Sequence, residues 1–330
     1  MQMQNQARFA KILLGVGASL YLTKSYFNGG KCTVHRDLQG QTVLITGGNR
    51  GIGKETALDL AKRGARVVIA SRSYDTLDVV KEIVKKSGNS KVEFVQLDLN
   101  DLQSIRNFAE KFNCENHRLD ILINNAGVYN TRFSKTKEGF ESNFGINHLG
   151  HFLLTNLLLQ KIVNTPQSRI VIVSSRAHTR SKTIDFDSLN QPTNSLIQEL
   201  ELYPQSKLAN CLFATELVDK LKGTDTKVVS LHPGVIKSGI YQHNFSQLPF
   251  GRLIGLLLYP ISLLCFKSEY YGAQTTLTCC YEDFNKLVNG GYYKDNQLYK
   301  QSPVSQDKEL ANKLWDYSLK AVKLENFKLY

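Results

Sequence analysis

The sequence predicts an α/β domain built on a doubly wound parallel sheet, preceded by an apolar N-terminal segment. Short runs of valine, isoleucine and leucine alternate with helical segments from residue 40 to residue 231. The runs are continuously apolar, which is typical of strands covered by helices on both faces. A glycine-rich turn follows the first run, and no repeat or low-complexity linker divides the body. We therefore expect one domain over residues 37–330.

The expected strands and helices follow one another along the chain. Strands are expected at residues 41–45, 66–70, 92–99, 120–124, 169–173 and 227–231. Helices are expected at residues 53–63, in a segment that ends near residue 86, and at 101–112, 140–163 and 203–221. Such regular alternation predicts parallel strands joined by helical crossovers. The segment 176–202 is polar and contains Pro192, so a surface loop beside the pocket is expected there.

Composition limits the class of protein. The chain has 330 residues, 42% hydrophobic and 21% charged, which excludes wholesale disorder and fibrous folds. Its 41 basic and 29 acidic residues give a net charge of +12. Six cysteines without a CxxC pair predict free thiols and no metal site. Since no basic stripe is interleaved with aromatic residues, nucleic acid is not an expected partner.

The first 36 residues carry no acidic side chain and contain an apolar run over residues 9–22. As a helix this run spans about 21 Å, less than the ~30 Å hydrocarbon core of a bilayer. An extension to residue 27 is long enough but includes Lys24, which would have to reach the interface. We expect residues 1–36 to be a membrane anchor, with a mitochondrial-type targeting segment and a cleaved signal as the alternatives.

A second apolar stretch covers residues 248–266. Pro249, Arg252 and Pro260 interrupt it, and the prolines argue against a simple spanning helix. We expect a flap that covers a pocket or dips into a membrane.

The glycine-rich turn reads Thr46-Gly-Gly-Asn-Arg-Gly-Ile-Gly53 and lies between the first expected strand and helix. Glycine permits a tight turn and the close approach of a pyrophosphate, and the helix N-terminus offers N–H groups to phosphate. A glycine turn without a ligand is the alternative. The position favours a Rossmann-type dinucleotide site. Its expected cofactor-binding residues are Gly47, Asn49, Arg50, Gly51, Ile52 and Gly53.

The end of the second strand distinguishes the two nicotinamide cofactors. NAD-binding proteins carry an acidic residue there, whereas this chain has Ala70-Ser71-Arg72. Arg72, together with Arg50, can hold a 2′-phosphate through forked, charge-assisted hydrogen bonds. The alternative for Arg72 is an ordinary solvated side chain. We expect NADP(H).

Five motifs occur in one order along the chain. They are the glycine turn, Asn124-Asn-Ala-Gly127, Ser175, Tyr203-Pro-Gln-Ser-Lys207 and His232-Pro-Gly-Val235. Together they resemble the short-chain dehydrogenase/reductase family. Segments 144–155, 174–178 and 206–209 are similar to its retinol dehydrogenase branch, and segments 26–32 and 184–190 to a mitochondrial-type member of that branch. The resemblance covers nearly the whole chain, including Leu314-Trp315.

The resemblance implies four catalytic residues: Asn147, Ser175, Tyr203 and Lys207. A free tyrosine has a pKa of about 10, and Lys207, one helical turn away, can stabilise the phenolate of Tyr203. Ser175 would polarise the substrate carbonyl, with Ser174 as the alternative, and Asn147 would support a water chain to the lysine. Because proline fits only the first turn of a helix, Pro204 predicts that Tyr203 starts its helix.

Further cofactor contacts follow from the same resemblance. Asp98 and Leu99 would meet adenine, although Asp98 could instead cap the helix that begins near Asp101. The remaining expected cofactor residues are Asn125, Ala126, Gly127, Pro233, Gly234, Val235 and Ser238, together with Tyr203 and Lys207.

Substrate contacts are expected from Ser175, Tyr203 and His178, with a loop hydrogen bond as the alternative for His178. His148 and His151 have helical spacing that could suit a metal. The branch carries both histidines in this helix without a metal, so no metal is expected.

The expected activity is NADP(H)-dependent interconversion of lipophilic aldehydes or ketones and alcohols, and the resemblance implies a retinoid. The alternatives are reduction of other lipophilic carbonyls, such as steroids or fatty aldehydes, and an NADP(H)-binding accessory subunit of a membrane complex. The expected location is a membrane, with the mitochondrial inner membrane favoured over the endoplasmic reticulum. The expected partners are the small-molecule substrate, the membrane, and a second copy of the chain or a membrane complex.

Overall fold

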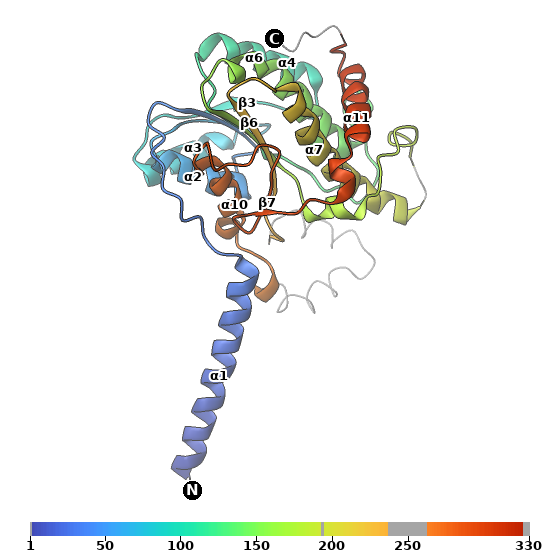
Figure 1. The fold of residues 1–330 in the computed structure, drawn as a ribbon. Helices are drawn as coiled ribbons and strands as arrows, with labels where there is room; N and C mark the ends of the chain where they lie inside the picture. The colour runs from blue at the N-terminus through green and yellow to red at the C-terminus, as the bar shows by residue number, and fades with distance from the viewer. Residues whose placement is uncertain (1, 193–194, 237–262, 326–330) are drawn as a thin grey trace.

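The computed structural model describes residues 2–192, 195–236 and 263–325 (Figure 1). Its centre is an eight-stranded sheet in the order β3-β2-β1-β4-β5-β6-β7-β8. The strands are β1 Thr42–Thr46, β2 Arg66–Ser71, β3 Val92–Gln96, β4 Ile121–Asn124, β5 Ser168–Val173, β6 Thr226–His232, β7 Tyr292–Lys294 and β8 Gln297–Tyr299. All pairs are parallel except β7 with β8. This confirms the predicted doubly wound sheet.

Helices cover both faces of the sheet (Figure 1). One layer consists of α2 (Gly51–Lys62), α3 (Thr76–Ser87) and α10 (Glu269–Tyr281), and the other of α4 (Leu102–Glu115), α6 (Gly150–Val163), α7 (Leu196–Lys220) and α11 (Lys308–Ala321). Alternate residues of β1 enter the two cores: Leu44 packs under α4 and α6, while Val43 and Ile45 pack under α2 and α10. Both faces are therefore buried, as the continuous apolar runs predict.

The six expected strands form with small shifts at their ends, but the third is shorter than expected. It ends at Gln96; Leu97 N still donates to Ser71 O of β2 at 2.8 Å, and the chain turns at residues 99–100. Strands β7 and β8 were not predicted because three residues carry too little pattern. Their hairpin does contain a readable signal, since Asp295 and Asn296 both adopt positive φ in the tight turn.

The expected helix over residues 140–163 is divided into three parts. They are α5 (Ser142–Phe144), the π-helical turn η1 (Gly145–Leu149) and α6. Asn147 lies in the middle of the π turn. Such turns insert one residue into a helix and are frequent at functional sites.

Helix α7 corrects two expectations. It begins at Leu196, so Pro204 lies inside the helix and Tyr203 does not start it. The segment 176–202 is likewise not wholly a surface loop, because the 3-10 helix η2 (Arg176–Arg180) and the first turns of α7 occupy part of it. The buried carboxylate of Glu199 accepts hydrogen bonds from Phe133 N and Arg132, and these contacts fix the turns that precede the proline.

Helix α1 (Gln2–Asn28) projects from the body (Figure 1). Lys24 Nζ, near its end, donates to the carbonyl oxygens of Leu263 (2.7 Å) and Phe266 (2.5 Å). Cys32 N donates to Gln274 Oε1 of α10 at 2.9 Å. Within the described residues, no helix combines the length and the apolar character that crossing a bilayer requires. Most of the expected flap, residues 248–262, lies outside the described residues.

A buried arginine joins α10 to the sheet. Arg169 in β5 is 1% exposed, and its Nη1 donates to the carbonyl oxygens of Cys279, Cys280 and Glu282 at the end of α10, at 2.9–3.0 Å. Burial lowers the pKa of Arg169 to about 10, so it stays charged at neutral pH.

We expect Arg169→Ala to lower the free energy of unfolding by about 3 kcal/mol, because three buried carbonyls lose a charged donor. Denaturant titration of the full chain measures this. The control is Arg180→Ala, which removes an exposed ion pair with Glu201 and costs about 0.5 kcal/mol. Equal losses in the two variants would contradict the role given to Arg169.

Candidate active site

The glycine turn brings three backbone segments into contact. A Cβ on Gly53 would lie 2.2 Å from the Gly47 carbonyl oxygen, and a Cβ on Gly47 would lie 3.0 Å from Ala126 Cα. Gly47 and Gly51 adopt φ of 66° and 59°, which glycine tolerates best. Side chains are excluded from this contact, and α2 begins within the turn, at Gly51.

The turn fits a pyrophosphate. Arg50 precedes α2 without making a side-chain capping hydrogen bond, so the first N–H groups of the helix have no side-chain acceptor there. These N–H groups and the helix dipole favour an anion. The site also lies at the carboxyl ends of β1 and β4, where the strand order reverses. Dinucleotides bind at this position in doubly wound sheets. Asn49 and Ile52 lie in the same turn, half-buried.

Arg50 lies in the glycine turn and Arg72 directly follows β2, and both residues are exposed. The turn after β2 is closed by Thr76 Oγ1, which donates to Ser73 O at 2.6 Å. The two arginines therefore stand at the same edge of the sheet as the glycine turn.

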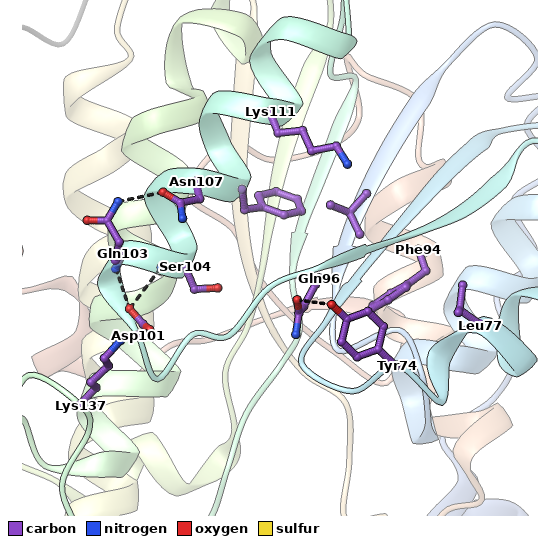
Figure 2. Close-up of a pocket in the computed structure, with 12 residues that line it drawn as sticks. Tyr74, Leu77, Phe94, Gln96, Asp101, Gln103, Ser104, Asn107, Lys111 and Lys137 are labelled. Carbon is purple, nitrogen blue, oxygen red and sulfur yellow. Dashed lines mark hydrogen bonds and ion pairs between the residues drawn. The ribbon is translucent and has the colours of Figure 1, made fainter.

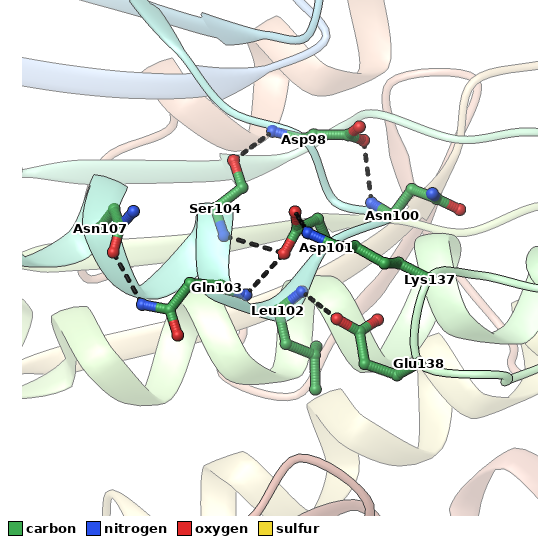
Figure 3. A network of polar contacts seen from close by, with 9 residues as sticks. All are labelled: Asp98, Asn100, Asp101, Leu102, Gln103, Ser104, Asn107, Lys137 and Glu138. Carbon is green, nitrogen blue, oxygen red and sulfur yellow. Dashed lines mark hydrogen bonds and ion pairs between the residues drawn. The ribbon is translucent and has the colours of Figure 1, made fainter.

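Asp98 does not cap α4 (Figure 3). Asp101 does so, by accepting hydrogen bonds from Gln103 N (2.8 Å) and Ser104 N (3.2 Å). Asp98 instead accepts from Asn100 N at 3.0 Å, and its own N–H donates to Ser104 Oγ. The helix-cap alternative for Asp98 is therefore wrong. Its neighbour Leu99 is buried in the core.

The turn after β4 is held against the glycine turn. Thr46 Oγ1 accepts hydrogen bonds from Asn125 N and Ala126 N, both at 2.9 Å. Asn125 Nδ2 donates to Thr46 O at 2.8 Å. A Cβ on Gly127 would lie 3.4 Å from Lys207 Nζ and 3.2 Å from Asn147 Oδ1. The 125–127 turn therefore faces the two predicted catalytic residues.

Lys207 is the buried cation of the site. It is 4% exposed, its Nζ donates to Val173 O at 3.2 Å, and it lies 5.7 Å from the centre of the Tyr203 ring. Burial lowers the pKa of Lys207 to about 8. Although Pro204 lies inside the helix, the one-turn spacing between lysine and tyrosine is preserved.

Asn147 is fixed in the π turn. Its Oδ1 accepts from Val128 N (2.8 Å), and its Nδ2 donates to Val128 O (2.9 Å) and Ser206 Oγ (3.0 Å). Both the oxygen and the nitrogen of its side-chain amide therefore take part in hydrogen bonds.

The two serines after β5 differ in environment. Ser174 is 2% exposed, and its hydroxyl donates to Lys207 O at 2.7 Å. Ser175 is half-buried and accepts from Ala177 N at 3.1 Å. His178 makes the loop hydrogen bond considered as its alternative, since Nδ1 lies 2.7 Å from Ser175 O. Burial lowers the pKa of His178.

The turn after β6 carries Pro233, Gly234 and Val235. Gly234 has φ of 96°, and a Cβ on it would lie 2.5 Å from Lys267 Cδ. Lys267 N donates to Val235 O at 2.8 Å, and its buried Nζ pairs with Asp295 at 2.6 Å. The backbone and the side-chain stem of Lys267 therefore both contact the turn. Ser238 lies outside the described residues.

Tyr129 is a site residue that the sequence reasoning missed. Its ring centre lies 4.5 Å from that of Tyr203. Burial raises the pKa of Tyr129, so it stays a neutral phenol. An aromatic residue two positions after Gly127 was the available signal.

A groove of about 690 Å³ lies elsewhere, at the β3 edge of the sheet between α3 and α4 (Figure 2). Tyr74, Phe94 and Phe108 contribute its apolar walls, and the Tyr74 hydroxyl donates to Gln96 Oε1 at 2.8 Å. It contains none of the predicted site residues.

Fold and site define a dinucleotide-binding α/β protein of the dehydrogenase type. The family model for short chain dehydrogenase matches residues 41–184. Retinol dehydrogenase 12 of Mus musculus is 42% identical over 309 residues, covering 91% of this chain and 93% of its own length. Retinol dehydrogenase 13 of Homo sapiens is 40% identical over 317 residues, covering 94% and 93%. The chain therefore belongs to the short-chain dehydrogenase/reductase family and is an oxidoreductase of the retinol dehydrogenase type, which confirms the resemblance.

Solved structures with the same fold are similar to this chain. An uncharacterised protein from Mycobacterium paratuberculosis has a TM-score of 0.69 at 32% identity, with 88% of this chain and 96% of that chain covered. A short chain dehydrogenase from Shigella flexneri, complexed with NADP, shares the fold with a TM-score of 0.58 at 19% identity, with 79% and 98% covered.

We expect Lys207→Met to stabilise the protein at pH 7 by about 3 kcal/mol, since the lysine pKa falls from 10.5 to about 8 and each pKa unit corresponds to roughly 1.4 kcal/mol. Between pH 8 and 10.5 the unfolded chain binds more protons at this residue than the folded chain does. The free energy of unfolding of the wild type therefore rises with pH in this range, and the difference between Lys207→Met and wild type becomes smaller.

Denaturant unfolding at pH 7 and pH 10 measures the effect, with the exposed Lys222→Met as the control. A Lys207→Met protein that is less stable than wild type at pH 7 would refute the assigned burial penalty.

Proposed function

We propose that the protein is an NADP(H)-dependent oxidoreductase that interconverts lipophilic aldehydes or ketones and alcohols. One observation carries the proposal: Lys207 Nζ is buried 5.7 Å from the centre of the Tyr203 ring, directly across from the 125–127 turn. A cation beside a phenol stabilises the phenolate and so makes tyrosine a usable acid and base near neutral pH.

The residues divide the proton chemistry among themselves. When bound, the nicotinamide gives or takes the hydride. In the reductive direction Tyr203 donates its phenolic proton to the carbonyl oxygen, and Lys207 stabilises the phenolate left behind. The Ser175 hydroxyl donates a hydrogen bond to the same oxygen as negative charge develops. The side-chain amide of Asn147 holds the backbone of Val128, next to the 125–127 turn. In the oxidative direction each proton moves the opposite way.

The preference for NADP(H) is supported by Arg50 and Arg72. Both are exposed cations at the edge where β1 and β2 end, and β2 ends in Ser71 rather than an acidic residue. A guanidinium fork matches a 2′-phosphate. The short chain dehydrogenase from Shigella flexneri, which shares the fold, is itself complexed with NADP.

The substrate is proposed to be lipophilic, with a retinoid as the first candidate because the relatives are named retinol dehydrogenases. The aromatic pair Tyr129 and Tyr203 supports an apolar group beside the reacting carbon. Steroid, fatty-aldehyde or other lipophilic carbonyls are the alternatives within the same chemistry.

Membrane association is part of the proposal, with residues 1–36 as its anchor. Support comes from α1, on which Leu14, Tyr21, Leu22 and Tyr26 expose most of their side-chain surface. The mitochondrial inner membrane is favoured over the endoplasmic reticulum on the resemblance of the N-terminal residues.

We expect the detergent-solubilised full chain to reduce retinaldehyde with NADPH. The decrease in NADPH absorbance measures the rate. Tyr203→Phe should lower kcat at least about 100-fold because the proton donor is lost.

Rapid turnover of a steroid ketone or fatty aldehyde but none of retinaldehyde would overturn the retinoid assignment. Wild-type protein that is inactive with every carbonyl would favour the accessory-subunit alternative. A greater loss in Ser174→Ala than in Ser175→Ala would reassign the serine.

For the cofactor, we expect Arg72→Ala to raise the KM for NADPH about tenfold and to leave the KM for NADH nearly unchanged. Lys81→Ala on α3 removes the same charge from an exposed ion pair and is the matched control. If wild type prefers NADH, or if both cofactors respond equally to Arg72→Ala, the NADP(H) assignment fails.

A further inference from the structure

A buried histidine connects three backbone segments of the candidate site. They are the π turn, the end of β1 at Thr46 and, through the Thr46 hydroxyl, the turn that begins at Asn125. His151, in the first turn of α6, is 2% exposed. Its Nδ1 lies 3.0 Å from the carbonyl oxygen of Asn147, and its Nε2 lies 2.8 Å from Thr46 Oγ1. The other acceptor near the Thr46 hydroxyl, Ile123 O, is farther away at 3.4 Å. One imidazole thus bridges the π turn and the strand end that starts the glycine turn.

Counting protons determines the tautomer. A hydroxyl has one proton and two lone pairs. Both lone pairs of Thr46 Oγ1 accept backbone N–H groups, from Asn125 and Ala126. The threonine cannot accept a third donor, so it must donate its proton to His151 Nε2. The histidine proton is then on Nδ1, where it donates to the Asn147 carbonyl.

The imidazole must also stay neutral. Protonation would place an Nε2–H against an oxygen whose lone pairs are already occupied. Burial lowers the pKa of His151 to about 4, and the nearby charge of Lys207 acts in the same direction. His148, the other titratable neighbour on this helix, is buried as well, and its pKa is lowered to about 3.

We propose that His151 is a positioning residue for the hydride-transfer site: as the neutral Nδ1–H tautomer, it fixes the Asn147 carbonyl and, through Thr46, the Asn125–Ala126 turn. The inference rests on the proposed function, because that turn and the glycine turn form the proposed cofactor site. Its loss would let the two turns separate from the π turn without removing any group that touches cofactor or substrate.

The chain offers a matched control on the same helix. His148 is 1% exposed, and its Nε2 lies 2.9 Å from Ser318 Oγ of α11, away from the turns. His148→Leu and His151→Leu therefore each remove a buried imidazole and one or more hydrogen bonds. Only the second variant disconnects the candidate site.

The experiment compares these variants by NADPH binding, measured from protein fluorescence, by kcat and by thermal unfolding. Both leucine variants should unfold at lower temperature. His151→Leu alone should weaken NADPH binding and lower kcat/KM, each about tenfold, as expected for leaving buried polar groups unpaired. His151→Asn can retain the donor toward Asn147, and His151→Gln the acceptor toward Thr46, so both should recover part of the loss.

Equal NADPH affinity and kcat/KM in His151→Leu and His148→Leu would overturn the inference. So would an ¹⁵N spectrum of histidine-labelled protein in which His151 carries its proton on Nε2 or titrates between pH 5 and 9. Wild-type protein that binds no NADPH would instead overturn the proposed function, and the tautomer spectrum would still decide the geometry independently.

Discussion

The candidate site depends on how closely the backbone after β1 approaches the backbone after β4. Gly47, Gly53 and Ala126 lie so close together that a single added methyl group would meet a backbone atom at 2.2–3.0 Å. The N-terminus of α2 lies at this contact, at the point where the strand order reverses. It also places the 125–127 turn opposite Lys207 and Asn147. Widening this contact by one side chain would displace every predicted cofactor residue near it.

Burying the charge of Lys207 at the candidate site costs folding free energy. Lys207 Nζ is buried and donates to the Val173 carbonyl oxygen, and burial disfavours its charged form. Natural proteins accept such costs where function needs them. Arg169 is a second buried cation, in β5. It shares one Nη1 among three carbonyls and thereby ties α10 to the sheet. Burial lowers the pKa of both cations, and they differ in their partners: Arg169 donates to three carbonyl oxygens, whereas Lys207 donates to that of Val173.

Much of the fold could be predicted because its signals are local. The continuous apolar strands, the glycine turn and the lysine one turn after Tyr203 are all visible in the sequence. Nonlocal contacts decided what was missed. The start of α7 depends on Glu199 binding to the 132–133 segment, and the π turn at Asn147 has no local signature. The identity of the α4 cap depended on which of two nearby aspartates turned toward the helix, and that was Asp101.

The end of α1 is bound by parts of the chain that lie far away in sequence. Lys24 reaches Leu263 and Phe266, and the backbone around Gly29 and Cys32 is held by Asn296 and Gln274. During synthesis at ~5–20 residues per second, these partners emerge on the order of tens of seconds after the first helix. The N-terminal segment therefore cannot dock while most of the chain is being made, and it stays accessible to other binding factors throughout that interval.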